Sequence, residues 1–140
     1  MKSETSIYTG FEFEVDGHPA SAIINTNLKE LTHKENYPYS VFIMLVPDLY
    51  MENGQPTIEE YDYLNNIEKE IIHYLEAQTQ TVHVGHTTLY RAREIIFYTK
   101  DREQVETFLD FYLQNVEREN EYEILSDPEW NNVAAFYELI

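Results

Sequence analysis

Hydrophobic and polar residues alternate in the first part of the chain. Between residues 7 and 15 one side of a two-residue period carries acids, and the other side is mainly apolar: Ile7, Phe11, Phe13 and Val15. This alternation predicts a half-buried strand. Asp16 and Gly17 predict a turn, and residues 20–27 predict a strand that returns beside the first. We therefore expect an N-terminal β-hairpin.

A different pattern, apolar on both faces, covers residues 37–46 (YPYSVFIMLV). The preceding residues 28–36 are polar and predict a loop or a short helical turn. Continuous apolar character is typical of a central strand covered on both sides. A strand covered by a helix on one side and by a loop or a partner on the other would also account for this pattern.

The strongest helical repeat lies in residues 57–76. Thr57 and Glu60 have the spacing of a capping box. One apolar stripe follows at intervals of three and four residues: Ile58, Tyr61, Leu64, Ile67, Ile71 and Leu75. Five charged residues fall off this stripe and are expected to be solvated: Glu59, Asp62, Glu68, Lys69 and Glu76.

Residues 81–102 predict two strands and the start of a second helix. The first strand is rich in Val and Thr, and Gly85 in its middle indicates a bulge or a close backbone approach. Residues 94–99 (EIIFYT) predict the second strand, so the turn falls within residues 89–93. Asp101 and Gln104 repeat the cap spacing and open a helix that runs to about Val116.

The end of the chain predicts a short strand and a terminal helix. The strand covers residues 122–125, and residues 126–129 (SDPE) are typical of a helix start, with a capping side chain and a proline in the first turn. Trp130 is interpreted as the anchor of this helix rather than as a ligand-stacking surface.

The predicted order from residue 37 to residue 125 is β-α-β-β-α-β, which is the split β-α-β series of ferredoxin-like folds. We expect an α+β protein with a ferredoxin-like antiparallel sheet, an added N-terminal β-hairpin and a C-terminal helix. The length of 140 residues suits a single domain, 1–140.

Composition favours a soluble globular protein. Cysteine is absent, which excludes disulfides and thiolate chemistry. The longest apolar run is too short to span a bilayer, and residues 1–10 lack the basic start and apolar core of a signal peptide. We expect a cytoplasmic location.

The net charge of −17 is unevenly distributed. Residues 81–100 contain three basic residues and one acid, whereas the flanking parts are strongly acidic. Such a field repels nucleic acid and anionic membranes and attracts basic partners. Solubility alone is the competing explanation of the charge.

Several motifs resemble a family catalogued as domain of unknown function 695, found mostly in bacteria. They are a valine–glycine strand at Gly85, the Arg93-Glu94 pair before the aromatic residues Phe97 and Tyr98, an acidic helix start, and the segment DPEW at residues 127–130. One departure concerns the turn, where Leu89, Tyr90 and Ala92 replace the expected glycines. The resemblance also implies a looser similarity in shape and charge to the regulator of ribonuclease E activity B, and it implies no functional residues.

Histidines and acids provide no strong site. His83 and His86 are three residues apart, so on a regular strand they lie on opposite faces and share no metal ion unless Gly85 forms a bulge. The acids of residues 59–60 and 117–123 lack a calcium-loop signature and a nearby acid–base partner, so solvated charge explains them better. We expect no catalytic residues, no metal and no cofactor.

The basic residues Arg91, Arg93, Lys100 and Arg102 are the remaining candidates. Arg91 and Arg93 are two apart and share a face if the chain is extended. They are interpreted either as partners of the surrounding acids, the favoured explanation, or as a contact for an anion or a partner protein.

Three functional hypotheses follow. The first is a non-enzymatic interaction or regulatory module whose acidic surface binds a basic protein. The second is a small-molecule binder or enzyme with a pocket near the 81–100 hairpin. The third is a homodimer formed through an exposed sheet edge.

Overall fold

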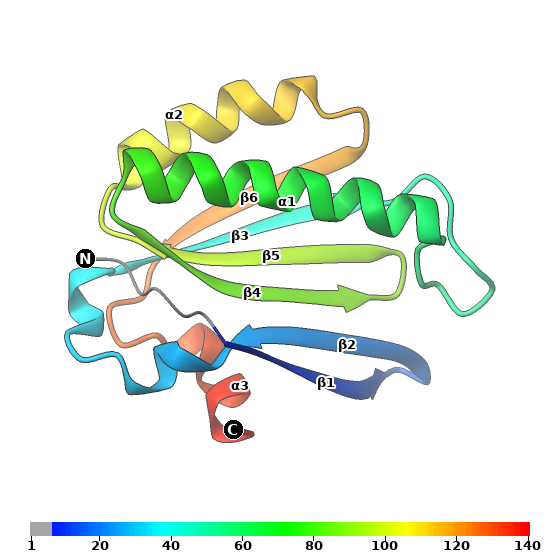
Figure 1. Cartoon of the computed structure of the whole chain (residues 1–140), viewed down its shortest axis with the longest axis horizontal. Coiled ribbons are helices and arrows are strands. Elements are labelled where there is room, and N and C mark those ends of the chain that lie inside the picture. Colours follow the sequence, from blue (N-terminus) through cyan, green and yellow to red (C-terminus); the bar gives the residue numbers. More distant parts are fainter. Residues whose placement is uncertain (1–6) are drawn as a thin grey trace.

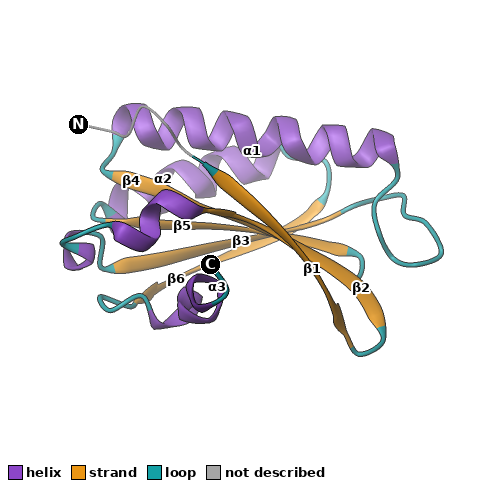
Figure 2. Ribbon diagram, turned by 60° about the horizontal axis from the view of Figure 1, so that its bottom comes forward, coloured by secondary structure: helices purple, strands orange, loops and turns teal. Residues whose placement is uncertain are grey.

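The fold is α+β, as a computed structural model of the chain shows, and the structure describes residues 7–140. A six-stranded antiparallel sheet has the order β1-β2-β4-β5-β3-β6. Helices α1 and α2 cover one face of the sheet, and α3 lies on the other (Figures 1 and 2).

The prediction that residues 1–10 are not a signal peptide concerns a segment that lies largely outside the described residues. Among the described residues, no helix is long and apolar enough to cross a membrane.

The helices and strands have the following bounds. The strands are β1 Tyr8–Val15, β2 His18–Asn25, β3 Tyr39–Val46, β4 Thr81–Leu89, β5 Ala92–Thr99 and β6 Glu119–Ser126. The α-helices are α1 Ile58–Gln78, α2 Arg102–Tyr112 and α3 Ala134–Glu138. Short 3₁₀ turns occur at Thr26–Glu30, Lys34–Asn36, Leu113–Asn115 and Asn131–Val133.

The predicted N-terminal hairpin is confirmed. Strands β1 and β2 pair along their whole length, and Val15 lies opposite His18. The two turn residues, Asp16 and Gly17, both have positive φ (54° and 82°), as the right-handed twist of a two-residue hairpin requires. Strand β2 then pairs with β4, so the hairpin extends the sheet rather than standing apart from it.

Strand β3 is the central apolar strand that the sequence predicts. Val41, Ile43 and Leu45 are fully buried against α1 and α2. The alternate residues Phe42 and Met44 point to the opposite face and are only half-buried. One face of β3 is therefore covered by helices, and the other remains partly open.

Helix α1 begins where Thr57 caps it, because the Thr57 hydroxyl accepts a hydrogen bond from the Glu60 amide (3.3 Å). The buried stripe starts at Leu64 rather than at Ile58, which is 80 % exposed. The prediction that Glu68 is solvated is wrong, since Glu68 is buried. Its position explains why: Glu68 lies four residues after Leu64 and three before Ile71, within the stripe.

The predicted cap after β5 does not form, and the helix after β6 begins later than the sequence predicts. The Asp101 carboxylate accepts from the Gln80 amide (2.6 Å) and makes no side-chain cap to α2. The terminal helix begins at Ala134 and not near residue 126, because Trp130 has a positive φ of 59° that interrupts helical geometry.

Trp130 nevertheless anchors the C-terminal segment as predicted. Its ring stacks on Tyr98 with 4.2 Å between centroids, and its indole Nε1 donates to the Tyr37 carbonyl (3.1 Å). The Asp127 carboxylate stabilises the adjoining turn by accepting from the amides of Asn131 and Asn132. The open side of the sheet is thus covered at one end only.

Candidate functional site

The four basic residues predicted as a contact do not come together. Arg91 and Arg93 lie at the start of β5, and Lys100 and Arg102 follow its other end. Arg91 occupies the turn with a φ of 60°, and its guanidinium lies 4.1 Å from the Tyr50 ring centroid. The extended alternation expected for Arg91 and Arg93 is therefore broken: Arg91 is exposed and Arg93 is fully buried.

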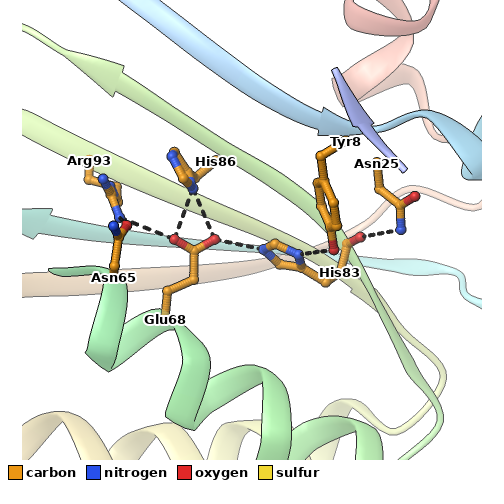
Figure 3. Close-up of polar contacts among 7 residues, drawn as sticks. All are labelled: Tyr8, Asn25, Asn65, Glu68, His83, His86 and Arg93. Carbon is orange, nitrogen blue, oxygen red and sulfur yellow. Dashed lines mark hydrogen bonds and ion pairs between the residues drawn. The ribbon is translucent and has the colours of Figure 1, made fainter. Parts of the chain in front are cut away.

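Arg93 points into a buried polar cluster centred on Glu68 of α1 (Figure 3). Its Nη1 donates to the Asn65 side-chain oxygen (2.6 Å) and to Glu68 Oε1 (3.2 Å). The guanidinium also lies 5.0 Å from the Tyr61 ring centroid. Two further nitrogens, Nε and Nη2, have no hydrogen-bond partner among the described residues.

Two histidines of β4 complete the cluster because the strand bulges. The register shifts between His83, which lies opposite Phe97, and Gly85, which lies opposite Ile96. This shift places His83 and His86 on the same face of the sheet, as the bulge expected at Gly85 allows. His83 Nε2 lies 2.7 Å from Glu68 Oε2, and His86 Nδ1 lies 2.9 Å from Glu68 Oε1.

Gly85 is required at this point of β4. Its φ is +148°, in a region that side chains rarely adopt, and an added Cβ would lie 1.9 Å from the Ile23 carbonyl oxygen of β2. The bulge and the close approach of β2 to β4 therefore depend on the same missing side chain.

The cluster stabilises a buried carboxylate. Burial by itself raises the pKa of Glu68, but the hydrogen bonds of His83 and His86, and the positive charge that these rings carry when protonated, outweigh burial and lower the pKa to about 2. Burial lowers the pKa of Arg93, and the Glu68 charge opposes that effect. Glu68 is therefore ionised at neutral pH and acts as the acceptor for the donors around it.

The cluster also extends to the N-terminal hairpin. The Tyr8 hydroxyl of β1 lies 2.8 Å from His83 Nδ1, and the Asn25 side-chain amide of β2 donates to the His83 carbonyl (3.2 Å). Acid–base chemistry is the chemistry that this arrangement offers. Among the described residues, no group of three or more His, Cys, Asp or Glu side chains could hold a metal ion.

Of the cavities that we describe, one borders the end of the 81–100 hairpin at Lys100, and the others lie elsewhere. The most voluminous one that we describe, about 840 Å³, lies between α1 and α2 and includes Tyr74, Phe108 and Phe111 in its lining. Three smaller ones lie on the same helix pair, beside Trp130, and beside Lys100 and Arg102.

A second feature is the uncovered part of the sheet opposite α1 and α2. Strand pairing places Met44 of β3 between Glu94 of β5 and Glu121 of β6, and places Phe42 opposite Glu123. Glu119 continues the row opposite Val46. We call this surface the acidic face; its residues are Phe42, Met44, Glu94, Glu119, Glu121 and Glu123.

The carboxylates of the acidic face have no close cationic partner among the described residues. Among the described residues, none of the four glutamates forms an ion pair. Glu60 provides a contrast, because Arg118 binds its carboxylate (2.7 Å) and lowers its pKa. Burial and the nearby charge of Glu123 instead raise the pKa of Glu94.

Sequence reasoning missed both features in part. The helical period indicates that Glu68 is buried, since the residue continues the Leu64 stripe. Its charge led instead to the prediction that it is solvated. The glutamates of β6 were interpreted as solvated charge, and their alternation over eight residues of edge strand is the signal that they share one face.

Comparisons with known proteins give one match. A family model described as "Family of unknown function (DUF695)" matches residues 9–137. No curated protein and no solved structure matches the chain.

Proposed function

Because the chain belongs to DUF695, a family of unknown function, we propose its role from surface chemistry: it is a non-enzymatic interaction module whose acidic face binds a basic segment of a partner protein. The observation that carries the proposal is a set of four glutamates, three along β6 and one on β5, that have no cationic partners among the described residues and lie around Phe42 and Met44. Lys and Arg side chains of a partner would neutralise the row, and their aliphatic stems would cover the apolar centre.

The energetics of Glu94 support this proposal. Its pKa is raised in the folded chain, so the ionised form at neutral pH opposes folding rather than favouring it. Glu123 of β6 adds to this repulsion. A residue that weakens the free protein but contacts a cationic partner is typical of a binding surface.

Salt dependence tests the proposal. A partner captured from the native cell extract, purified and titrated against the protein, should lose affinity steeply as NaCl rises, because exposed charge pairs are screened. Substituting Glu119, Glu121 and Glu123 by Gln should weaken the binding and flatten its salt dependence. The matched control substitutes Glu12 and Glu14 of β1 by Gln, which removes exposed acids away from the acidic face. An affinity that changes neither with the salt concentration nor with the β6 substitutions would refute the proposal.

The single substitution Glu94→Gln separates stability from binding. We expect it to raise the free energy of unfolding at pH 7 modestly, by up to about 1 kcal/mol, because it removes a partly desolvated charge, and to weaken partner binding. Urea denaturation at pH 7 and at pH 4 measures the first effect, which should be smaller at pH 4, where Glu94 is more often protonated. Lower stability at pH 7 would contradict this account.

We also propose that β3 to β6, with α1 and α2, form a ferredoxin-like unit in a cytoplasmic protein. The order β4-β5-β3-β6 and the placement of both helices on one face support that arrangement. The glutamates of β6 disfavour pairing of that edge with a second copy, since like charges would face each other. Glu12 and Glu14 give the β1 edge the same repulsion, so a homodimer through either edge is disfavoured, and sedimentation of the protein at low and high salt would test this.

A further inference from the structure

The polar cluster contains a chain of three groups that leads from the core to the surface. Glu68 contacts one nitrogen of the His83 ring, and the Tyr8 hydroxyl contacts the other, at 2.7 and 2.8 Å. The side chains of Glu68 and His83 are 6 % and 5 % exposed, whereas Tyr8 is 40 % exposed. Three different elements supply these residues, α1, β4 and β1 (Figure 3).

The surroundings of Glu68 determine which nitrogen of His83 carries the proton. Arg93 donates to the Glu68 carboxylate, and His83 Nε2 and His86 Nδ1 also lie within hydrogen-bond distance of it. An ionised carboxylate can only accept hydrogen bonds, so all three nitrogens act as donors to it. His83 Nε2 must therefore carry a hydrogen to bond Glu68. In a neutral ring Nδ1 is then an acceptor, and the Tyr8 hydroxyl donates to it.

This order of donors and acceptors is that of an activated nucleophile. A hydroxyl donates to a histidine, and the histidine is oriented by a buried carboxylate that also stabilises the imidazolium when it forms. We propose that Tyr8 is a nucleophilic acyl-acceptor site, with His83 as its general base and Glu68 as the residue that positions His83.

The transfer step balances without any further reactant. The Tyr8 oxygen attacks the carbonyl carbon of an ester, and the phenol proton passes to His83 Nδ1 as the new C–O bond forms. The bond to the leaving oxygen then breaks, and that oxygen takes the proton from His83. The products are an acyl-tyrosine ester and the free alcohol or phenol, and His83 returns to its neutral state.

The net charge of the protein favours an uncharged compound as the donor of the acyl group. With a net charge of −17, the chain repels anionic donors such as phosphoryl or adenylyl compounds. A neutral acyl donor meets no such barrier. This inference concerns a different surface from the acidic face and does not depend on the proposed function.

The test is the acetylation of the whole protein by p-nitrophenyl acetate, followed by peptide mass spectrometry. Four other tyrosines serve as internal controls because their exposure, 38 to 41 %, equals that of Tyr8: Tyr50, Tyr61, Tyr74 and Tyr90. Tyr90 is the closest match, since its ring also lies beside a histidine, His18, with 4.0 Å between centroids. General-base assistance should make Tyr8 react at least about tenfold faster than any of the four.

Two variants test the roles of His83 as the general base and of Glu68 as its positioning residue. His83→Gln retains hydrogen-bonding capacity but cannot accept a proton, and it should reduce the Tyr8 rate to that of the control tyrosines without changing theirs. Glu68→Gln should reduce the Tyr8 rate in the same direction, and circular dichroism checks that each variant folds. A Tyr8 rate no greater than that of the four controls, or one unaffected by either folded variant, would overturn the proposal.

A measurement on the unaltered protein covers the case in which the buried variants fail to fold. The nitrogen chemical shifts of the His83 ring at neutral pH should show an unprotonated Nδ1 and a protonated Nε2. The opposite tautomer would overturn the assignment of His83 as the base.

Discussion

At the scale of single residues, the decisive group is the buried carboxylate of Glu68. Three side chains that carry or can carry positive charge, His83, His86 and Arg93, surround it (Figure 3). A buried ion is tolerated when paired and hydrogen-bonded, and removing one member leaves the others without their acceptor. Glu68 therefore holds together side chains from α1, β4 and β5.

Replacing Glu68 by Gln should destabilise the protein by about 3 to 5 kcal/mol at pH 7. The pKa of Glu68 is about 2 in the folded chain and about 4.5 in the unfolded chain, so its contribution is present above pH 4.5 and is lost as the pH falls towards 2. The difference between wild type and Glu68→Gln should shrink accordingly. Urea denaturation between pH 7 and pH 3 measures it.

Asp62→Asn is the matched control for this substitution, because Asp62 lies on the same helix in solvent. It should change the free energy of unfolding little at any pH. An equal effect of both variants, or a Glu68→Gln effect that grows on acidification, would contradict the buried-carboxylate account.

At the scale of elements, strand β4 is distinguished by its bulge. A regular strand would direct His83 and His86 to opposite faces, and the extra residue at the bulge reverses that alternation. The same irregularity brings the β2 backbone close to Gly85. One local feature of β4 thus joins the hairpin to the sheet and assembles the cluster.

Gly85→Ala should destabilise the protein by more than about 3 kcal/mol or prevent folding, because a positive-φ strain of roughly 1–3 kcal/mol adds to a backbone clash. Gly10→Ala of β1 is the control, since its Cβ would meet nothing closer than the Ala22 carbonyl oxygen at 3.9 Å. Thermal unfolding of the two variants compares them. If both lost the same stability, strand position rather than the bulge would be responsible.

At the scale of the whole molecule, negative charge dominates. Most of the acids lie outside the Glu68 cluster, and only a few ion pairs, such as those of Arg118 with Asp48 and Glu60, compensate them among the described residues. Repulsion between like charges opposes the compact state. The two apolar clusters on the faces of the sheet must overcome this repulsion.

Added NaCl should therefore raise the Tm of the free protein, because screening weakens the repulsion between exposed carboxylates more than it weakens buried pairs. Thermal unfolding from low to about 0.3 M NaCl, beyond which the Debye length is already short, measures the effect. The variant with Glu119, Glu121 and Glu123 replaced by Gln should show a smaller rise. A Tm that falls with salt would mean that attractive surface pairs outweigh the repulsion.

The sequence by itself determined the secondary elements and the α+β class. Alternation, the 3.6-residue period and the turn residues are local properties of the chain, and they placed the β1–β2 hairpin, β3, α1 and the β4–β5 pair close to their observed bounds. The role of Trp130 as an anchor was also predicted, since Trp130, Val133, Ala134 and Tyr137 follow one another at three- and four-residue spacing.

Only the tertiary structure decided where the charged and polar groups meet. The burial of Glu68 depends on donors that arrive from β4 and β5, fifteen and twenty-five residues further along the chain. The side chain of Asp101 binds Gln80 rather than its own helix because β4 and β5 are neighbours. Charge alone predicts solvent exposure, and a charged residue is buried only where folding brings its partners within hydrogen-bond distance.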